Sequence, residues 1–410
     1  MRISTNQIYQ RALSHLMNQE QRLASLQQQL SSGIRVQTPS DDPLASAQIE
    51  LIQQRVNLTE ILQKNRQTTQ SALQLEEGTI GNATDTLMRL RELQLQAGNP
   101  SLSEDARKAI GIEANTILNE MVNFANTKDS NGSYMFSGAM TTTQPVILNG
   151  AGQYVYNGDS TIRYQNVTQS LQVATNDTGD NLFMRIPNGN GTFTVKQTAT
   201  TNTGTASVSA GTAVSGGFTP DTYTMSFALN TQGNLVVMVS GVASGNVIPP
   251  TGLPDDAPLY QDGGTVSFNG AQVVVTGAPN AGDAFTISPA SNESIFSTIQ
   301  RVVANLNQPF STSTQKAAIQ TENNQLLTQI DSALGRLVDV RSDLGARLNQ
   351  LDLADESNND YLEISQITLK QLREINPTQV ATEVNMQLIN LQAAQMSFAR
   401  IQGLSLFNYI

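Results

Sequence analysis

The chain has 410 residues, enough for two or three domains, and carries a formal net charge of −11 with no cysteine, no tryptophan and one histidine. This acidic balance excludes the basic patch of a nucleic-acid-binding protein, and zero cysteine excludes a disulfide framework and a thiolate zinc site. Residues 1–7 lack the apolar core of a secretory signal, and no uncharged apolar run approaches the roughly 20 residues that span a bilayer. Composition alone therefore predicts a soluble cytoplasmic protein with no membrane insertion.

The first helix is predicted over residues 3–34. Leucines recur along one face of this segment, and three of them stand a heptad apart, namely Leu16, Leu23 and Leu30. Gly33 suits the end of the helix because glycine tolerates the left-handed conformation of a C-cap. His15 lies inside the segment, and we interpret this lone helical histidine as a surface or packing residue.

The segment from Thr38 to Pro43 predicts a turn followed by a helix start. Pro43 suits the first helical turn, and Ser40, Asp41 or Asp42 can supply the N-cap. Paired aspartates are also found in catalytic and metal sites, but carboxylates favour a helix N-terminus because of its dipole. We therefore interpret these aspartates as capping residues.

A long helical region runs from Leu44 to about Ala97 without proline, and apolar residues repeat every seven positions in both of its halves. A further helix is predicted from about Ser103 to Thr127, with an apolar face that includes Ile110. Helices of this length with heptad spacing indicate a coiled-coil bundle rather than a compact globule.

Residues 139–290 have a different composition, with no glutamate, three basic residues and eight aspartates. Short strand-like runs such as Tyr223–Phe227 and Leu235–Val239 alternate with Asn-Gly and Gly-Asp turn signals. This pattern predicts an all-β domain with antiparallel strands. The stretch from Thr198 to Gly217 is low in large apolar residues and predicts a mobile loop or an insertion.

Helix returns at about residue 292, and the longest predicted helix follows Pro309, from about Ser313 to Leu372. One heptad position of this helix holds Ile330, Leu337, Leu344 and Leu351, and the predicted partner position holds Leu327, Leu334 and Leu348. A terminal helix begins near Pro377, with Thr378 and Thr382 as candidate caps.

Both ends of the chain carry an apolar helical face that a lone helix cannot satisfy in water. Such a face is covered either by the same domain, or by other copies of the chain or a neighbouring protein. Because both ends of the chain are apolar, we favour burial of these faces against other copies of the chain or a neighbouring protein. The predicted assembly interface consists of Leu13, Leu16, Leu23, Leu30, Val384, Leu388, Leu391, Phe398 and Ile401, and the apolar character continues to Ile410.

The predicted fold class is α+β, an elongated helical coiled-coil bundle built from both termini with an inserted all-β domain in the middle of the chain. Residues 1–40 and 376–410 form terminal helices of an assembly core. Residues 41–138 and 291–375 form a long-helix coiled-coil domain, and residues 139–290 form an all-β outer domain.

The sequence contains no catalytic constellation. One histidine and no cysteine remove most nucleophile–base pairs, and no phosphate-binding glycine loop or EF-hand spacing is present. We therefore predict that the protein is not an enzyme and has no catalytic residue, no metal site and no cofactor.

Several motifs resemble the bacterial flagellin family. Ser31–Val36 followed by Ser40–Pro43 is similar to its N-terminal signature, and Gln392–Leu404 is similar to its closing helix. Within this family, some stretches are similar to the members that join the flagellar hook to the filament: Asn126–Gly138, Gly282–Pro289 with Ser294–Ile299, and Gly403–Ile410. The resemblance covers roughly residues 1–140 and 280–410.

The resemblance implies a structural protein of the bacterial flagellum, a ring of copies between the hook and the filament. It implies export through the flagellar type III apparatus, and hence a secreted rather than cytoplasmic protein. Implied partners are the first hook-associated protein, flagellin, further copies of this chain, and a cytoplasmic export chaperone that holds the C-terminal helix. The alternatives are a filament-forming flagellin within the family and, outside it, a secreted adhesin or enzyme with a ligand-binding β domain.

Overall fold

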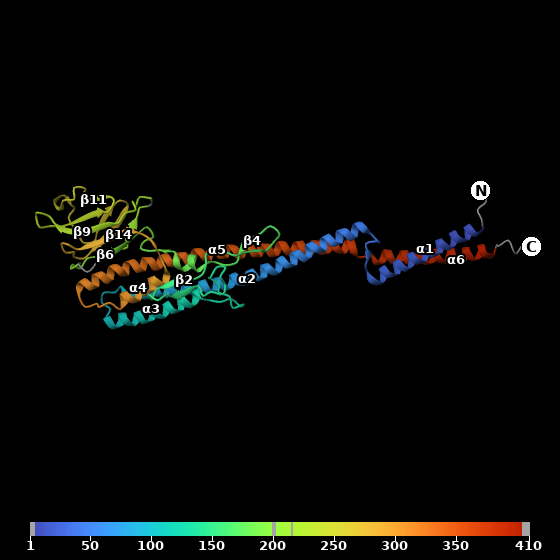
Figure 1. Ribbon diagram of the computed structural model, residues 1–410, viewed down its shortest axis with the longest axis horizontal. Coiled ribbons are helices and arrows are strands. Elements are labelled where there is room, and N and C mark those ends of the chain that lie inside the picture. Colours follow the sequence, from blue (N-terminus) through green and yellow to red (C-terminus); the bar gives the residue numbers. More distant parts are fainter. Residues whose placement is uncertain (1–4, 199–201, 215, 404–410) are drawn as a thin grey trace, which may run out of the picture. The chain divides into compact units, whose positions relative to one another are not determined.

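The computed structural model describes residues 5–198, 202–214 and 216–403, with the backbone alone at residues 5, 6, 8 and 401–403. The α-helices of this part of the chain are α1 Thr5–Ser32, α2 Pro43–Ala97, α3 Glu104–Ala125, α4 Ile295–Leu306, α5 Ser313–Arg373 and α6 Pro377–Gly403. They lie within a few residues of the predicted helices. Helices at both ends of the chain with strands between them confirm the predicted α+β class (Figure 1).

The strands are short, and every pairing between them is antiparallel. In chain order they are β1 Val146–Leu148, β2 Tyr154–Tyr156, β3 Tyr164–Asn166, β4 Gln172–Ala174, β5 Ile186–Pro187, β6 Phe193–Gln197, β7 Ser207–Val208, β8 Thr212–Ala213, β9 Tyr223–Leu229, β10 Leu235–Gly241, β11 Gly245–Ile248, β12 Gly264–Phe268, β13 Ala271–Thr276, β14 Ala284–Pro289 and β15 Asn292–Glu293. A short π-helix at Asp180–Met184 and a 3₁₀ helix at Pro254–Asp256 interrupt them.

The chain divides into two compact units, which we describe separately. The terminal unit contains residues 1–66, 167–171 and 353–410, and the central unit contains residues 67–166 and 172–352. The division between the units falls inside α2 and α5. The domain boundaries predicted from the sequence lie instead in the segments between helices, near residues 40, 138, 290 and 375. This predicted division into domains stays a prediction.

In the central unit, the apolar residues of α2 and α5 are buried together with those of α3 and α4. The predicted heptad from Ile330 to Leu351 is confirmed, since each of its four members is at most 1% exposed. The predicted partner position is wrong by one residue. Leu326, Ala333 and Val340 are buried, whereas Leu327, Leu334 and Leu348 are only half-buried. Both choices keep the three- and four-residue steps of a heptad, so the sequence pattern does not distinguish them.

A buried acidic pair fixes one position along these helices. Glu76 of α2 is 1% exposed, and an oxygen of its carboxyl group accepts a hydrogen bond from the backbone N–H of Asp177 at 2.9 Å. The Asp177 carboxylate in turn pairs with Arg347 of α5 at 2.6 Å. Burial, together with the nearby Asp177 carboxylate, raises the pKa of Glu76 to about 8. Glu76 is therefore mostly protonated and uncharged at neutral pH.

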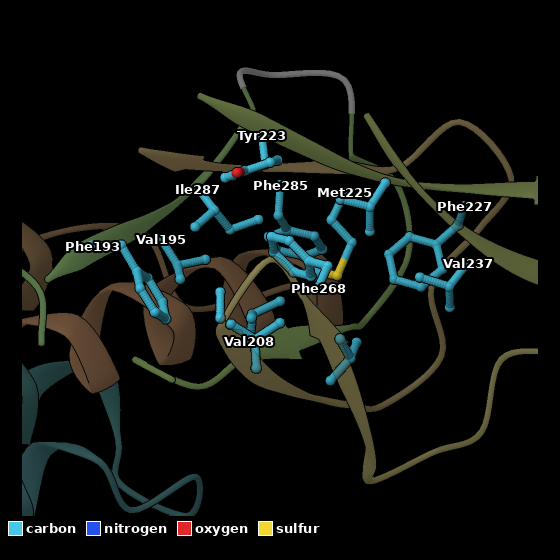
Figure 2. Close-up of a cluster of buried hydrophobic side chains, with 14 of the residues drawn as sticks. Phe193, Val195, Val208, Tyr223, Met225, Phe227, Val237, Phe268, Phe285 and Ile287 are labelled. Atoms are coloured by element: carbon cyan, nitrogen blue, oxygen red, sulfur yellow. The ribbon is translucent and has the colours of Figure 1, made fainter. Parts of the chain in front are cut away.

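The larger strands form a β-sandwich. One sheet has the order β11-β10-β9-β14-β6, and the other has the order β12-β13-β7 with β8 also paired to β13. Their inner faces make one apolar core, in which Met225 and Phe285 of the first sheet face Phe268 and Val208 of the second (Figure 2). Alternating buried and exposed residues along β9 and β13 show the two-residue period of strands with one face in a core.

Side chains of α5 cover one edge strand of each sheet, β6 in the first and β7 in the second. The backbone N–H of Val208 in β7 donates to the Thr321 hydroxyl at 3.1 Å, and the Val208 carbonyl accepts from the Asn324 amide at 3.2 Å. The N–H of Val195 in β6 donates to the buried Gln325 carbonyl oxygen at 3.3 Å. Exposed strand edges promote unwanted pairing, so these contacts protect the sandwich and attach it to the helices of the same unit.

The stretch from Thr198 to Gly217 is not a mobile loop over its described residues. Val208 is fully buried, and β7 and β8 both pair with β13. Small residues at most of these positions hid the strands from pattern analysis, because only Val208 and Val214 supply large apolar side chains. Residues 199–201 and 215 lie outside the described part of the chain.

The raised pKa of Glu76 predicts a pH-dependent stability. Its folded-state pKa of about 8 lies above the ordinary value of 4.5, so between these values the folded chain holds a proton that the unfolded chain has released. The stabilisation is complete below pH 4.5 and is lost as the pH rises through 8. We expect Glu76→Gln to flatten this decline, measured as the free energy of urea unfolding from pH 5 to 9. The exposed Glu120→Gln variant is the control, and equal slopes in both variants would contradict the assignment.

Candidate assembly interface

The two terminal helices pair with each other inside the terminal unit. Leu23 of α1 packs against Val380, Val384 and Leu391 of α6, and these four residues form a small buried cluster. At the far end of the pair, the rings of Tyr9 and Phe398 lie 5.2 Å apart. Early residues of α1 thus meet late residues of α6, so the helices run antiparallel (Figure 1).

The residues predicted for the assembly interface divide into two groups. Leu23, Val384 and Leu391 are buried between α1 and α6, and Leu16 and Phe398 are half-buried on the same seam. Leu13, Leu30 and Leu388 are exposed, at 41%, 40% and 36%. The side chain of Ile401 and the apolar residues from Leu404 to Ile410 lie outside the described residues. Part of the predicted face is therefore covered within the chain.

A second apolar face on the pair is exposed, and the sequence analysis missed it. On α6 it contains Met386, Ile389 and Met396, which are 57%, 64% and 63% exposed. On α1, Met17 is also exposed, at 58%. The signal was present in the sequence, because Met386, Ile389 and Met396 follow at steps of three and seven. The same helix carries a second apolar series, from Val384 to Ile401, which has the same helical spacing.

Exposed apolar residues continue along the other helices of this unit. On α2, Leu44, Leu51 and Leu58 occupy the predicted heptad position but are 71%, 49% and 47% exposed. On α5, the exposed set is Leu353, Ile364 and Ile367. Isolated exposed leucines are ordinary, but a heptad series of them along a helix forms an exposed apolar stripe, a feature typical of interaction surfaces.

The two connections between terminal and long helices are bonded to each other. The Arg35 N–H donates to the Arg373 carbonyl at 2.7 Å, and the Ile375 N–H donates to the Gly33 carbonyl at 3.0 Å. The Arg35 guanidinium adds a bond to the Leu372 carbonyl at 2.8 Å and an ion pair with Asp42 at 3.0 Å. This joint, residues 33–42 with 372–376, holds the entry to α2 beside the exit from α5.

Local caps shape the joint. Gly33 adopts φ +74° after the last residue of α1, as the sequence predicted. Asp42 caps α2 by accepting from the Ala45 N–H at 3.0 Å, and this hydrogen bond and the Arg35 partner lower the pKa of the Asp42 carboxyl. Asp41 instead accepts from the N–H of Thr38 at 2.8 Å, within the preceding turn. The paired aspartates thus have capping and turn roles.

The start of α6 differs from the prediction. The side chain of Asn376, rather than a threonine, accepts from the Gln379 N–H, at 3.4 Å. Thr378 and Thr382 lie inside the helix, where the Thr382 hydroxyl donates to the Thr378 carbonyl at 2.8 Å. Asparagine is as good an N-cap as threonine, and it precedes Pro377 at the position where the helix begins.

Two further observations concern other kinds of site. Among the described residues, no group of three or more His, Cys, Asp or Glu side chains is arranged to hold a metal ion. No helix of the same residues combines the length and the apolar character needed to cross a membrane.

Comparison with known proteins finds related sequences and structures. Residues 3–141 match the family model described as the bacterial flagellin N-terminal helical region. Flagellar hook-associated protein 3 of Escherichia coli (strain K12) is 30% identical over 183 residues. That alignment covers 45% of this chain and 57% of the relative, so the chain spans little more than half the length of this curated relative.

Two solved structures from Legionella pneumophila resemble the chain over most of its length. The flagellar hook-associated protein-3 has 66% sequence identity and a TM-score of 0.78, covering 79% of this chain and 98% of that one. The flagellar junction protein has 65% identity and a TM-score of 0.75, covering 80% of this chain and 100% of that one.

The joint gives a test of how the terminal unit is held together. Arg35→Ala removes the guanidinium bonds to Leu372 and Asp42 while leaving both backbone bonds possible. We expect hydrogen exchange at the Ile375 amide to quicken roughly fivefold, because a net hydrogen bond contributes about 1 kcal/mol. Arg22→Ala, at an exposed position of α1, is the matched control. Unchanged exchange in Arg35→Ala would show that the guanidinium does not hold the joint.

Proposed function

Because this chain belongs to the family of flagellar hook-associated protein 3, the flagellar junction proteins, we propose that it is a structural protein connecting the flagellar hook to the filament. The observation that carries the proposal is the likeness to the junction protein of known structure, which extends over 80% of this chain. The role is architectural rather than enzymatic, in keeping with one histidine and no cysteine in the whole sequence.

The terminal unit supplies the surface through which copies assemble. Its inner seam, with Leu23, Val384 and Leu391, is satisfied in the single chain. Its exposed apolar residues on α1, α6, α2 and α5 are free for contact with neighbouring copies. Each such side chain contributes on the order of 1.5–3 kcal/mol when a neighbour buries it fully. Of the residues predicted from the sequence, Leu13, Leu30 and Leu388 belong to this outer set.

The nested division of the chain fits this role. Residues 1–40 and 376–410 form the assembly core, residues 41–138 and 291–375 form the long-helix domain, and residues 139–290 form the outer β domain. Support comes from the pairing of α1 with α6 and from the change of composition at the edges of the β region. The short turn 167–171 is an exception, since it belongs to the terminal unit, where the Val167 carbonyl accepts from Asn358 at 2.9 Å.

The proposed partners follow from the proposed position. The first hook-associated protein lies on the hook side, flagellin lies on the filament side, and further copies of this chain complete a ring. Before assembly, a cytoplasmic export chaperone covers the C-terminal helix, where Met386, Ile389 and Met396 are exposed. Export through the flagellar apparatus makes the protein a secreted one. A filament-forming flagellin is the second candidate, because the family model that matches residues 3–141 is a flagellin model.

Antibody labelling of intact flagella in the electron microscope separates these functions. We expect label in a narrow band between hook and filament, because a junction protein occupies one position along the axis. Label along the whole filament would identify a flagellin instead. A flagellum without any label would reject both functions and favour an adhesin that acts through its β domain.

The outer apolar face predicts a variant that folds but does not assemble. Ile389→Glu places a charge on the exposed face of α6, so we expect the circular dichroism melting curve of the monomer to change little. The same charge buried between copies costs several kcal/mol, and the variant should fail to restore motility to a strain that lacks the protein.

Two other variants serve as controls for the effect of Ile389→Glu. Gln395→Glu adds the same charge at an exposed position of α6 about 120° around the helix axis from Ile389, and should restore motility. Val384→Glu places the charge in the inner seam and should lower the melting temperature of the isolated chain. Normal motility with Ile389→Glu would exclude this face from the assembly interface.

A further inference from the structure

A pocket in the central unit is lined only by residues of that unit and by none of the residues proposed for assembly. It has a volume of about 260 Å³ and lies between the α2–α3 connection, the segment before α5 and the first turns of α5. Its walls include Pro100, Phe310 and Ile319. Two of its lining residues are cationic, Arg107 and Lys316, and no lining residue is acidic.

The two cations lie around one aromatic ring. The Arg107 guanidinium carbon is 4.5 Å from the centre of the Phe310 ring, and the Lys316 ammonium nitrogen is 5.0 Å from it. An aromatic face attracts a cation but leaves its charge uncompensated. Lys316 is exposed, and no ion pair to it is found among the described residues. In a chain of net charge −11, this local excess of positive charge is unusual.

Arg107 shows that the site is incompletely satisfied. It is 1% exposed, and its two terminal nitrogens donate to the carbonyls of Ala97 and Asn305 at 3.0 and 3.1 Å. Its Nε is buried without a hydrogen-bond partner among the described residues. Burial lowers the pKa of the guanidinium, and no carboxylate raises it. A buried donor without a partner costs free energy unless a water or a ligand satisfies it.

Two more buried polar atoms near Arg107 lack partners in the described part of the chain, namely Asn305 Oδ1 and Gln94 Oε1. Asn305 is the residue whose carbonyl accepts from Arg107, and the Gln94 carbonyl accepts from the N–H of the pocket residue Gly98 at 3.1 Å. Neither Asn305 nor Gln94 lines the pocket, so Arg107 Nε is the unpartnered atom that belongs to a pocket-lining residue. Because unpartnered buried atoms are rare in native proteins, this donor points to a bound species in the pocket.

The charges indicate what kind of species fits. The carbonyls that hold Arg107 lie at the C-terminal ends of α2 and α4, which carry partial negative charge and offset the guanidinium. Lys316 then remains as the one uncompensated charge, and this favours a monoanion. Apolar walls and the Phe310 ring favour a flat apolar body, and the volume lies below the range typical of drug-sized ligands.

We propose that this pocket binds a small planar monocarboxylate. Its carboxylate lies at Lys316, on the side of the Phe310 ring that faces Arg107. Its apolar body packs against Pro100, Phe310 and Ile319. The ligand connects the α2–α3 connection to the start of α5. Binding is separate from assembly, since none of these residues belongs to the terminal unit.

The test uses benzoate as the probe and the full-length chain with labelled isoleucine methyl groups. Titration should shift the Ile319 methyl resonance along a saturable curve, with a dissociation constant on the order of 1 mM, as expected for so small a ligand. Benzamide has the same shape without the charge and should produce no saturable shift. Lys316→Gln should weaken benzoate binding by about tenfold or more, because it removes a charge-assisted hydrogen bond.

Lys196→Gln is the matched control, because it removes the same charge at an exposed position of β6 outside the pocket, and it should bind benzoate like the unaltered chain. Phe310→Leu retains both cations and should also weaken binding through loss of the ring. Equal titration curves for Lys316→Gln and Lys196→Gln would overturn the proposal. So would an absence of saturation with the unaltered chain, or binding of benzamide as strong as that of benzoate.

Discussion

The pairing of the first helices with the last ones is the interaction on which the rest of the structure depends. Arg91 of α2 and Asp331 of α5 form an ion pair at 2.5 Å across 240 positions of sequence, and α1 and α6 meet across a still longer interval. An isolated helix with an apolar stripe is marginal in water, so neither half of the chain can be stable without the other. The entropic cost of bringing two distant segments together grows only with the logarithm of the length of chain between them. A whole β-sandwich can therefore be inserted between the paired helices at little extra cost.

Polar groups inside the helical core make this pairing specific. A purely apolar seam with heptad spacing tolerates a slip of seven residues, because the pattern repeats. Glu76 requires the Asp177 N–H, and Asp177 requires Arg347, so a slip would leave charged or polar groups buried without partners. Arg107 acts similarly by joining the C-terminal ends of α2 and α4. The apolar residues supply most of the free energy, and these polar groups select one register.

Sequence patterns predicted the helices well because heptads, prolines and glycines are local signals. Gly33, Asp42 and Pro377 each stand within one residue of a helix end. The short strands β7 and β8 could not be predicted in this way, because both pair with the distant strand β13, and β7 also bonds α5 side chains more than 100 positions away. The same limit explains the partner heptad position of α5, where Leu326 rather than Leu327 is buried. That choice depends on what surrounds the helix.

The assembly residues were only partly predictable for a related reason. The sequence identifies a residue as apolar, but it does not say whether its cover comes from the same chain or from another. Leu23 and Leu391 proved to cover each other, while Leu13 and Leu388 stayed exposed. Only the three-dimensional structure distinguishes the residues buried between α1 and α6 from the residues that stay exposed. The exposed residues include Met17, which was not among the residues predicted from the sequence.

The geometry of α6 explains how one helix serves both purposes. Val384 belongs to the seam with α1, and Ile389 belongs to the exposed series. At 3.6 residues per turn, the five positions between them correspond to a rotation of about 140° around the helix axis, so the two apolar faces point in nearly opposite directions. Because α1 covers one of these faces, the second face stays exposed in the single chain, and a neighbouring copy of the kind proposed above could cover it without opening the seam between α1 and α6.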